Sequence, residues 1–405
     1  MRARLGGLAA ALALGAAPAG AQWGDAERVT IASSVDGAPQ AAYFYDPAPG
    51  IDVPVPLLVA LHSWSSDYTQ ASNAAFVALA RERGWVLIHP DFRGPNVRPE
   101  AAGSDLVVAD LLDAVAYARR RRPIDSTRVY LVGASGGGFT ALVAAARAPG
   151  TWAAVSAWVA IADLERWHAY SRTRDTRYWR DIEAVVGGDP GVDPGARRAA
   201  RARSPRYLLD TAHLGGLALD LNVGIDDGLV RPSQTLLAFN AVAAAADTFT
   251  AAQLDRLDAE RAVPPELRRE GGDDPFLEIL LERASRGHRV RVFAGGHEID
   301  REAAVAWLGS SPGDGDGGPV GVASGHRVAR LRVWPSPAPG RLLRFEAAWP
   351  VDVATLVDLS GRVVARREGV GAREGRLEVG PLAAGPYVLR VRGRDAAASV
   401  LVTLD

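Results

Sequence analysis

Continuous apolar runs alternate with helical segments along most of the chain, and this alternation limits the possible folds more than any other feature. Val55–His62 (VPLLVALH) is apolar without a break, as expected for a strand that is buried on both faces of a sheet. Further strands are expected at Val29–Ser33, Ala41–Tyr45, Trp85–Pro90, Arg128–Gly133, Trp152–Ile161, Ala218–Val223 and Val290–Phe293, and helices at Ala74–Arg83, Leu106–Arg120 and Gly137–Arg147. Strands that alternate with helices are joined by right-handed crossovers, so the sequence predicts an α/β fold with a mostly parallel sheet and flanking helices.

The pattern changes near residue 310. Ser310–Gly325 is rich in Gly, Asp, Ser and Pro and has no apolar periodicity, which is typical of a flexible linker. Beyond it, short alternating stretches separated by turns replace the helices, for example at Leu342–Phe345, Ala354–Leu359 and Tyr387–Val391. We therefore expect two folded domains, at residues 27–309 and 326–405, of which the second is a small all-β sandwich.

The first 21 residues have the layout of a secretory signal peptide. Arg2 and Arg4 precede an apolar run over Leu5–Ala17, and the sequence AGA at 19–21 resembles a cleavage site. A buried N-terminal helix is the alternative. No later stretch has the roughly 18 uninterrupted apolar residues that a membrane span needs. We therefore expect no membrane span, and a protein that is secreted or held at the cell surface after export through the periplasm.

The composition excludes several kinds of chemistry. The chain of 405 residues contains no Cys, and none of its 46 basic residues is Lys, so all of them are Arg. The first absence excludes disulfides, thiolate metal sites and a Cys nucleophile, and the second excludes Schiff-base and P-loop lysines. A formal net charge of −1 gives no electrostatic reason to expect nucleic acid as a partner. Covalent chemistry must therefore use Ser, Thr, Asp, Glu, His or Tyr.

Gly133–Gly137 (GASGG) is the segment that most directly indicates chemistry. It matches G-x-S-x-G and lies between a predicted strand and a predicted helix. A sharp strand-to-helix turn of this kind holds its serine in a strained conformation with the hydroxyl exposed. The motif therefore predicts Ser135 as a nucleophile and the N–H of Gly136 as a donor to an oxyanion. A Gly-rich loop that merely packs a helix onto the sheet is the alternative.

A serine nucleophile needs an acid and a base, which follow it along the chain in this kind of fold. Of the seven His, only His297 directly follows a predicted strand, which predicts it as the base. Asp226 and Asp227 both follow the penultimate strand of this sheet and compete for the role of the acid. A second oxyanion donor is expected in the loop after the third strand, where the backbone N–H of Trp64 or of Ser63 is the candidate. A plain loop with an exposed Trp is the alternative there.

Four motifs together resemble the catalytic domain of the prolyl oligopeptidase family within the α/β-hydrolase fold, over roughly Val29–Leu308. They are GASGGG, DFRGPN (Asp91–Asn96), GIDDGLV and GGHE. The acid motif of that family runs G-x-x-D-x-x-V, and Gly224, Asp227 and Val230 fit it as a set. The resemblance therefore implies that Asp227 is the acid.

The chain departs from the pattern of that family in three ways. The stretch before the first strands is too short for the β-propeller of larger members, so the resemblance is to the catalytic domain alone. His62-Ser63-Trp64 stands where H-G-G is usual. About 70 residues separate Asp227 from His297, which is more than expected and indicates an insertion.

The last 75 or so residues resemble a different family, the C-terminal sorting domain of type IX secretion substrates. The matching segments, in the order of that family, are residues 333–338 (VWPSPA), 357–362 (VDLSGR) and 382–388 (LAAGPYV). Ser336-Pro337 replaces the usual Asn-Pro. The resemblance implies the type IX secretion machinery as a partner, and an accessory carbohydrate-binding or adhesive β-domain is the alternative.

These features predict a secreted serine hydrolase. Ser135 would attack an acyl carbon, His297 would take its proton and Asp227 would orient the imidazole, with no need for a metal or cofactor. Small acyl esters are the expected substrates and short peptides the second choice. The alternatives are a true serine-type peptidase and a non-catalytic surface binding protein on the same scaffold. Residues 163–190, rich in aromatic side chains, and residues 247–286, with a charged helical pattern, are expected to control access to the site.

Overall fold

The computed structural model describes residues 23–268, 274, 276–310, 332–335, 342–358, 363–379, 385–392 and 397–404. The chain divides into two compact units, Met1–Asp316 and Gly317–Asp405. The predicted signal peptide and the predicted linker from residue 311 onward lie outside the described residues, so both remain predictions.

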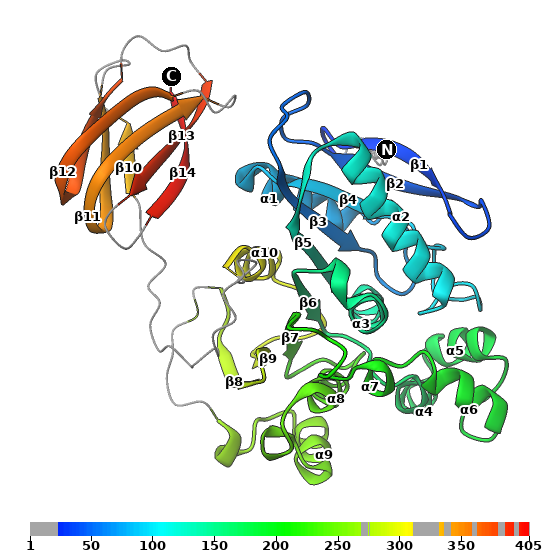
Figure 1. Ribbon diagram of the computed structural model, residues 1–405. Helices are drawn as coiled ribbons and strands as arrows, with labels where there is room; N and C mark the ends of the chain where they lie inside the picture. The colour runs from blue at the N-terminus through cyan, green and yellow to red at the C-terminus, as the bar shows by residue number, and fades with distance from the viewer. Residues whose placement is uncertain are drawn as a thin grey trace, which may run out of the picture. The chain divides into compact units, whose positions relative to one another are not determined.

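A nine-stranded sheet forms the centre of the first unit (Figure 1). Its strands lie in the order β1-β2-β4-β3-β5-β6-β7-β9-β8. The six strands from β4 to β9 in that order run parallel, whereas β1 and β2 at one edge and β8 at the other run antiparallel to their neighbours. The strands are β1 (Glu27–Ala32), β2 (Pro39–Tyr45), β3 (Val55–Leu61), β4 (Val86–Pro90), β5 (Ile124–Ala134), β6 (Ala154–Trp158), β7 (Ala218–Gly224), β8 (Ile279–Ser285) and β9 (His288–Phe293). The predicted α/β fold with a mostly parallel sheet is confirmed.

The central strands are buried on both faces, as their unbroken apolar runs predict. Every residue of β3 after Val55 is buried, and so are all residues of β4 and β6. Strands covered by helices on both sides have no solvent face, so their sequence does not alternate between apolar and polar residues.

Helices cover the sheet in two groups (Figure 1). The α1 helix contacts α10, whereas α2 contacts α3 and α3 contacts α7. The helices are α1 (Ala75–Arg83), α2 (Asp105–Arg121), α3 (Gly136–Arg147), α4 (Leu164–Thr173), α5 (Tyr178–Val186), α6 (Pro194–Arg201), α7 (Pro205–Leu208), α8 (Pro232–Val242), α9 (Ala251–Glu260) and α10 (Arg301–Ser310), with short 3₁₀ turns η2 (Ala71–Ala74), η3 (Pro149–Thr151), η4 (Ala245–Asp247) and η5 (Pro265–Leu267). Their ends follow local chemistry. For example, α2 begins where Ser104 Oγ accepts the Val107 N–H at 3.2 Å, and it stops at Arg122, which is extended because a proline follows.

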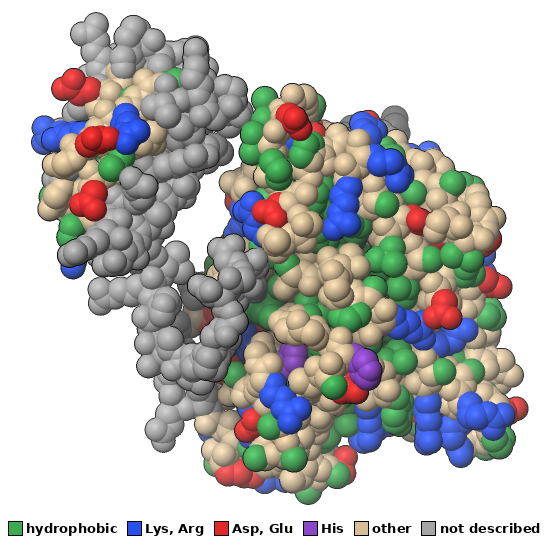
Figure 2. All heavy atoms as spheres, in the orientation of Figure 1, with side chains coloured by type: hydrophobic (Ala, Val, Ile, Leu, Met, Phe, Trp, Pro, Cys, Tyr) green, Lys and Arg blue, Asp and Glu red, His purple; other side chains and the backbone are tan. Residues whose placement is uncertain are grey.

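The segment between β6 and β7 forms a helical insertion, α4 to α7. Its inward face is apolar, with Trp167, Ile182 and Ala200 buried. Arginines lie on its outward face, and Figure 2 shows basic side chains over α4 and α6. Residues 163–190 therefore pack on the first unit through this face, and their expected control of access to the site stays a prediction.

The second predicted insertion, residues 247–286, is helical only in its first part. Residues 251–260 form α9, but residues 279–285 form the edge strand β8, which pairs antiparallel with β9. The prediction of a helical pattern up to residue 286 is wrong for β8. The physical reason is that pairing with the free edge of β9 decides the conformation of this segment, and its local sequence does not show that contact.

The second unit is antiparallel, and the predicted all-β character is confirmed. Its strands lie in the order β10-β11-β13-β14, and β12 pairs with β11. They are β10 (Arg332–Pro335), β11 (Leu342–Asp358), β12 (Val363–Glu378), β13 (Gly385–Arg392) and β14 (Ala397–Leu404). These strands are longer than predicted and belong to one hydrogen-bonded sheet rather than to two separate ones. Leu343, Phe345 and Leu377 are buried at alternate positions, as one covered face of a sheet requires.

Part of the predicted sorting motifs falls outside the described residues, namely residues 336–338, 359–362 and 382–384. The type IX resemblance therefore stays a prediction. None of the helices in the described parts of the chain has the length and apolar composition that crossing a membrane would require.

Candidate active site

Ser135 lies at a strained turn between β5 and α3. Its backbone has φ 59° and ψ −121°, a conformation that non-glycine residues rarely adopt. Close packing of the backbone makes its glycine neighbours necessary. A Cβ on Gly133 would lie 2.4 Å from the carbonyl carbon of Gly137, and a Cβ on Gly137 would lie 2.7 Å from the carbonyl oxygen of Leu61. The predicted strand–turn–helix context of the G-x-S-x-G motif is present.

Asp227 and His297 form a hydrogen-bonded pair. Asp227 Oδ2 lies 2.7 Å from His297 Nδ1, and the carboxylate is fully buried while the imidazole is 24% exposed. The other oxygen, Asp227 Oδ1, accepts the N–H of Leu229 at 2.9 Å and the N–H of Val230 at 2.8 Å. Asp226 has an exposed side chain. Of the two competing carboxylates, the structure brings Asp227 to the imidazole and leaves Asp226 in solvent.

The three candidate residues follow parallel strands, so they meet at one edge of the sheet. Ser135 follows β5, Asp227 follows β7 and His297 follows β9. The two loops after β7 and β9 are joined by backbone hydrogen bonds from Ile225 to Phe293 and from Asp226 to Gly295, both of 2.9 Å.

No hydrogen bond joins Ser135 to His297 in the described part of the chain. In a site without substrate such contacts are often long, and they tighten when substrate binds.

Two backbone N–H groups are candidates to bind an oxyanion. A Cβ on Gly136 would lie 2.3 Å from the amide nitrogen of Trp64, so the two amides are close neighbours. The Ser63 N–H is already used, because it donates to Gln70 Oε1 at 2.7 Å. Trp64 is therefore the remaining candidate for the second donor. Its ring is only 2% exposed, so the alternative of a plain loop with an exposed Trp is wrong.

The Trp64 amide is held by contacts that the sequence analysis did not anticipate. The Trp64 N–H belongs to the same peptide group as the Ser63 carbonyl, and the oxygen of that carbonyl lies 3.0 Å from His62 Nδ1. The other ring nitrogen of His62 lies 2.6 Å from the carbonyl oxygen of Asp91, and the Asn96 N–H donates to the Trp64 carbonyl at 2.8 Å. The DFRGPN motif thus supports the loop that carries Trp64. Nothing local in the sequence indicates this role, because the two loops are brought together only by the parallel pairing of β3 and β4.

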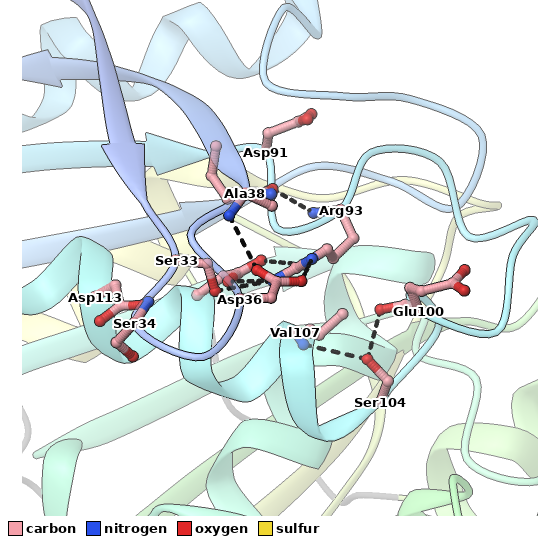
Figure 3. A network of polar contacts seen from close by, with 12 residues as sticks. Ser33, Ser34, Asp36, Ala38, Asp91, Arg93, Glu100, Ser104, Val107 and Asp113 are labelled. Atoms are coloured by element: carbon pink, nitrogen blue, oxygen red, sulfur yellow. Dashed lines mark hydrogen bonds and ion pairs between the residues drawn. The ribbon is translucent and has the colours of Figure 1, made fainter.

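Arg93 in the same motif anchors the loop after β4 (Figure 3). Its Nε lies 2.6 Å from Asp110 Oδ2, its Nη1 lies 2.7 Å from Asp36 Oδ2 and its Nη2 lies 2.8 Å from Ser33 Oγ. The hydrogen bonds with Asp36 and Asp110 raise the pKa of Arg93, and the Arg93 contact lowers the pKa of Asp36 to about 2. The ion pairs hold Arg93 at φ 81°, in the left-handed region. This loop is fixed both by these ion pairs and by Phe92, which is buried and stacks on the His62 ring at 3.8 Å.

One cluster in the insertion offers metal-ligand types. Ligand atoms of His168, Glu183 and Asp189 lie within 4.8 Å of one another. Each imidazole nitrogen already faces a carboxylate, with Nε2 3.0 Å from Glu183 Oε1 and Nδ1 3.7 Å from Asp189 Oδ1. The Arg172 guanidinium also pairs with Asp189. A cation there would face the positive charge of Arg172, so these residues suit a charge-paired contact between α4 and α5 better than a metal site.

A small polar pocket lies beside the loop after β7. Its lining residues are Arg166, Trp167, Tyr170, Arg231, Ser233, Gln234 and Asp258. Burial raises the pKa of Asp258. The lining includes no member of the Ser135, Asp227 and His297 set.

Comparisons with known proteins agree with this geometry. Residues 71–247 match the prolyl oligopeptidase family, a range that includes Ser135 and Asp227 but not His297. No curated protein is significantly similar to the chain.

Solved structures with similar folds include three peptidases from different organisms. The first is an acylaminoacyl peptidase of Pyrococcus horikoshii, with 15% identity and a TM-score of 0.46 over 71% of this chain and 40% of that chain. The second is a puromycin-hydrolyzing peptidase of Mycobacterium tuberculosis, with 18% identity and a TM-score of 0.47 over 74% of this chain and 42% of that chain. The third is prolyl oligopeptidase B of Galerina marginata, with 18% identity and a TM-score of 0.43 over 54% of this chain and 31% of that chain. The chain spans less than half the length of each of these proteins. Residues 71–247 are thus similar to the prolyl oligopeptidase family, and this range holds the nucleophile turn and the Asp227 carboxylate that contacts His297.

Proposed function

We propose that Ser135, His297 and Asp227 form a catalytic triad that hydrolyses acyl bonds through an acyl-enzyme. The observation that carries the proposal is the 2.7 Å contact between Asp227 Oδ2 and His297 Nδ1, taken together with the strained turn at Ser135. Because Nδ1 donates to the carboxylate, Nε2 is the nitrogen left to accept the Ser135 proton. Ser135 Oγ then bonds to the acyl carbon, and the proton passes from His297 to the leaving group.

The negative charge that develops on the substrate oxygen needs fixed donors. The N–H groups of Gly136 and Trp64 donate to no other group among the described residues, and close backbone packing holds them together. In a water-poor site, two such donors stabilise an oxyanion strongly. We assign them the role of the oxyanion hole.

Small acyl esters are the proposed substrates, and short peptides or aminoacyl anilides are the second candidate. The insertion packs directly on the ring of Trp64, since Trp167 lies 4.9 Å from it centre to centre, which favours small substrates over folded proteins. The family match at residues 71–247 favours peptide bonds. The ratio of kcat/KM for p-nitrophenyl butyrate to that for alanine and proline anilides decides between them. Anilide hydrolysis of equal or greater efficiency would make the protein a peptidase first.

Variants of the triad test the mechanism. We expect Ser135→Ala, His297→Ala and Asp227→Asn each to lower kcat by about a thousandfold or more, with little further loss in double variants, because the three residues act as one unit. Asp226→Asn is the matched control, since its side chain is exposed. Covalent labelling by a fluorophosphonate should disappear in Ser135→Ala. Full turnover in Asp227→Asn together with its loss in Asp226→Asn would refute the assignment of the acid.

Export is a separate part of the proposal. The signal-peptide layout at residues 1–21 and the three sorting motifs in the last 75 or so residues support secretion or surface attachment, with the type IX secretion machinery as the partner. Amino-terminal sequencing of extracellular protein would be expected to begin after residue 21. Retention in the cell of protein that carries both segments, in a host with that machinery, would count against this part.

A further inference from the structure

We propose that Tyr170 and Trp167 of α4 are positioning residues for Asp227, acting through the two peptide groups that bind its carboxylate. The inference rests on the proposed function, because it concerns the acid of the proposed triad. It assigns the aromatic residues of the insertion a role other than contact with substrate.

The starting point is the way in which the carboxylate is held. Asp227 Oδ1 accepts the Leu229 N–H at 2.9 Å and the Val230 N–H at 2.8 Å. In a trans peptide group the C=O points opposite to the N–H, so the carbonyls of these two groups face away from the carboxylate. Their environment therefore determines how firmly the two N–H groups are aimed.

Each of these carbonyls is bound by a side chain of α4. The Tyr170 hydroxyl donates at 2.8 Å to the Gly228 carbonyl, which belongs to the same peptide group as the Leu229 N–H. The Trp167 Nε1–H donates at 3.1 Å to the Leu229 carbonyl, which belongs to the same peptide group as the Val230 N–H. Two parallel chains of hydrogen bonds thus run from α4, through one peptide group each, to the same oxygen of Asp227.

The helix is well suited to this task. Residues 167 and 170 are three apart and so lie on one face of α4. Asp163 caps the helix through the Arg166 N–H at 3.1 Å, and its other oxygen pairs with Arg206 at 2.8 Å. Trp167 is 1% exposed, and the Arg231 guanidinium lies 4.2 Å from the centre of the Tyr170 ring. The two donors therefore have fixed positions.

The expected effect is on orientation of the imidazole rather than on substrate binding. A donor at the carbonyl polarises a peptide group and strengthens the hydrogen bond that its N–H makes. Without the donor, the carbonyl loses a partner and the peptide group can rotate, which loosens the hold on Asp227 and so on His297. Asp227 does not touch substrate in the proposed mechanism, so the loss should appear in kcat and not in KM.

Tyr170→Phe is the first test, since it removes only a hydroxyl. With p-nitrophenyl butyrate we expect kcat to fall about tenfold, with KM changed by less than about twofold. Tyr178→Phe is the matched control. Its ring packs 5.1 Å from the same Trp167, but its hydroxyl makes no hydrogen bond among the described residues, so kcat should stay at the wild-type value. Trp167→Phe, which removes the indole N–H, should act in the same direction as Tyr170→Phe.

A double-mutant cycle separates positioning from a general structural role. In the Asp227→Asn background, Tyr170→Phe should change the residual kcat by less than about twofold, because it acts only through that carboxylate. The same tenfold loss in both backgrounds, or a wild-type kcat in Tyr170→Phe alone, would overturn the inference. Failure of the proposed function looks different: full activity of Ser135→Ala would refute the triad itself, whereas a silent Tyr170→Phe with an inactive Ser135→Ala rejects only the positioning role.

Discussion

At the scale of single residues, Gly136 occupies a crowded backbone position of the candidate site. A Cβ there would lie 2.3 Å from the amide nitrogen and 2.4 Å from the Cα of Trp64. Gly136→Ala must therefore push the two proposed oxyanion donors apart. We expect kcat for p-nitrophenyl butyrate to fall about 100-fold, since loss of one such donor has an effect of this order.

Gly150→Ala is the control for this substitution. No atom lies within 4 Å of a Cβ built at Gly150, so turnover should be unchanged. Wild-type kcat in Gly136→Ala would show that the Gly136 and Trp64 amides are not the oxyanion donors.

At the scale of secondary structure, the β8–β9 hairpin carries a buried imidazole. His288 is the first residue of β9, is 3% exposed, and its Nδ1 has no hydrogen-bond partner among the described residues. Burial lowers the pKa of His288 from 6.5 to about 4. The folded chain therefore prefers the neutral ring, while the unfolded chain takes up a proton below pH 6.5. The stabilisation is complete above pH 6.5 and is lost as the pH falls toward 4.

This linkage can be measured by urea unfolding at pH 7 and pH 4. His288→Leu fills the same buried space with an apolar side chain that cannot be protonated. Between pH 7 and pH 4 the free energy of unfolding of this variant should therefore fall less than that of wild type, and the two decreases should differ by on the order of 3 kcal/mol. His213→Gln is the control, because the His213 side chain is 78% exposed. Equal losses in wild type and His288→Leu would contradict the prediction.

At the scale of the whole molecule, the chain divides into two compact units. All candidate site residues lie in Met1–Asp316, and the last helix of that unit, α10, ends at Ser310. Leu308 is fully buried, so α10 must be kept whole. A chain that ends after Ser310 should therefore retain the kcat/KM of the full chain for p-nitrophenyl butyrate.

The thermal midpoint of the shortened chain, measured beside its activity, completes this test. Soluble protein with unchanged kcat/KM is the expected result. Loss of activity in folded protein would show that the β unit contributes to the site.

Much of the architecture could be predicted because it depends on local patterns. Unbroken apolar runs such as 55–61 form strands buried on both faces, since helices cover both sides of the sheet. The resemblance to the family motif G-x-x-D-x-x-V, which Gly224, Asp227 and Val230 fit, also selected the carboxylate that contacts His297. The strained Ser135 follows from the strand–Gly-x-Ser-x-Gly–helix order, because only small neighbours permit that turn.

The sequence by itself thus determined the sheet and the strand–turn–helix position of Ser135, both of which depend on short-range patterns along the chain. Only the tertiary structure decided that residues 279–285 form an edge strand, that Trp64 is buried, and that Tyr170 and Trp167 donate to the carbonyls of Gly228 and Leu229 beside Asp227. The physical reason is distance along the chain. These contacts join segments about 60 residues or more apart, or complete the free edge of a strand. The local periodicity of a sequence shows which face of an element is apolar, but it does not show which partner will cover that face.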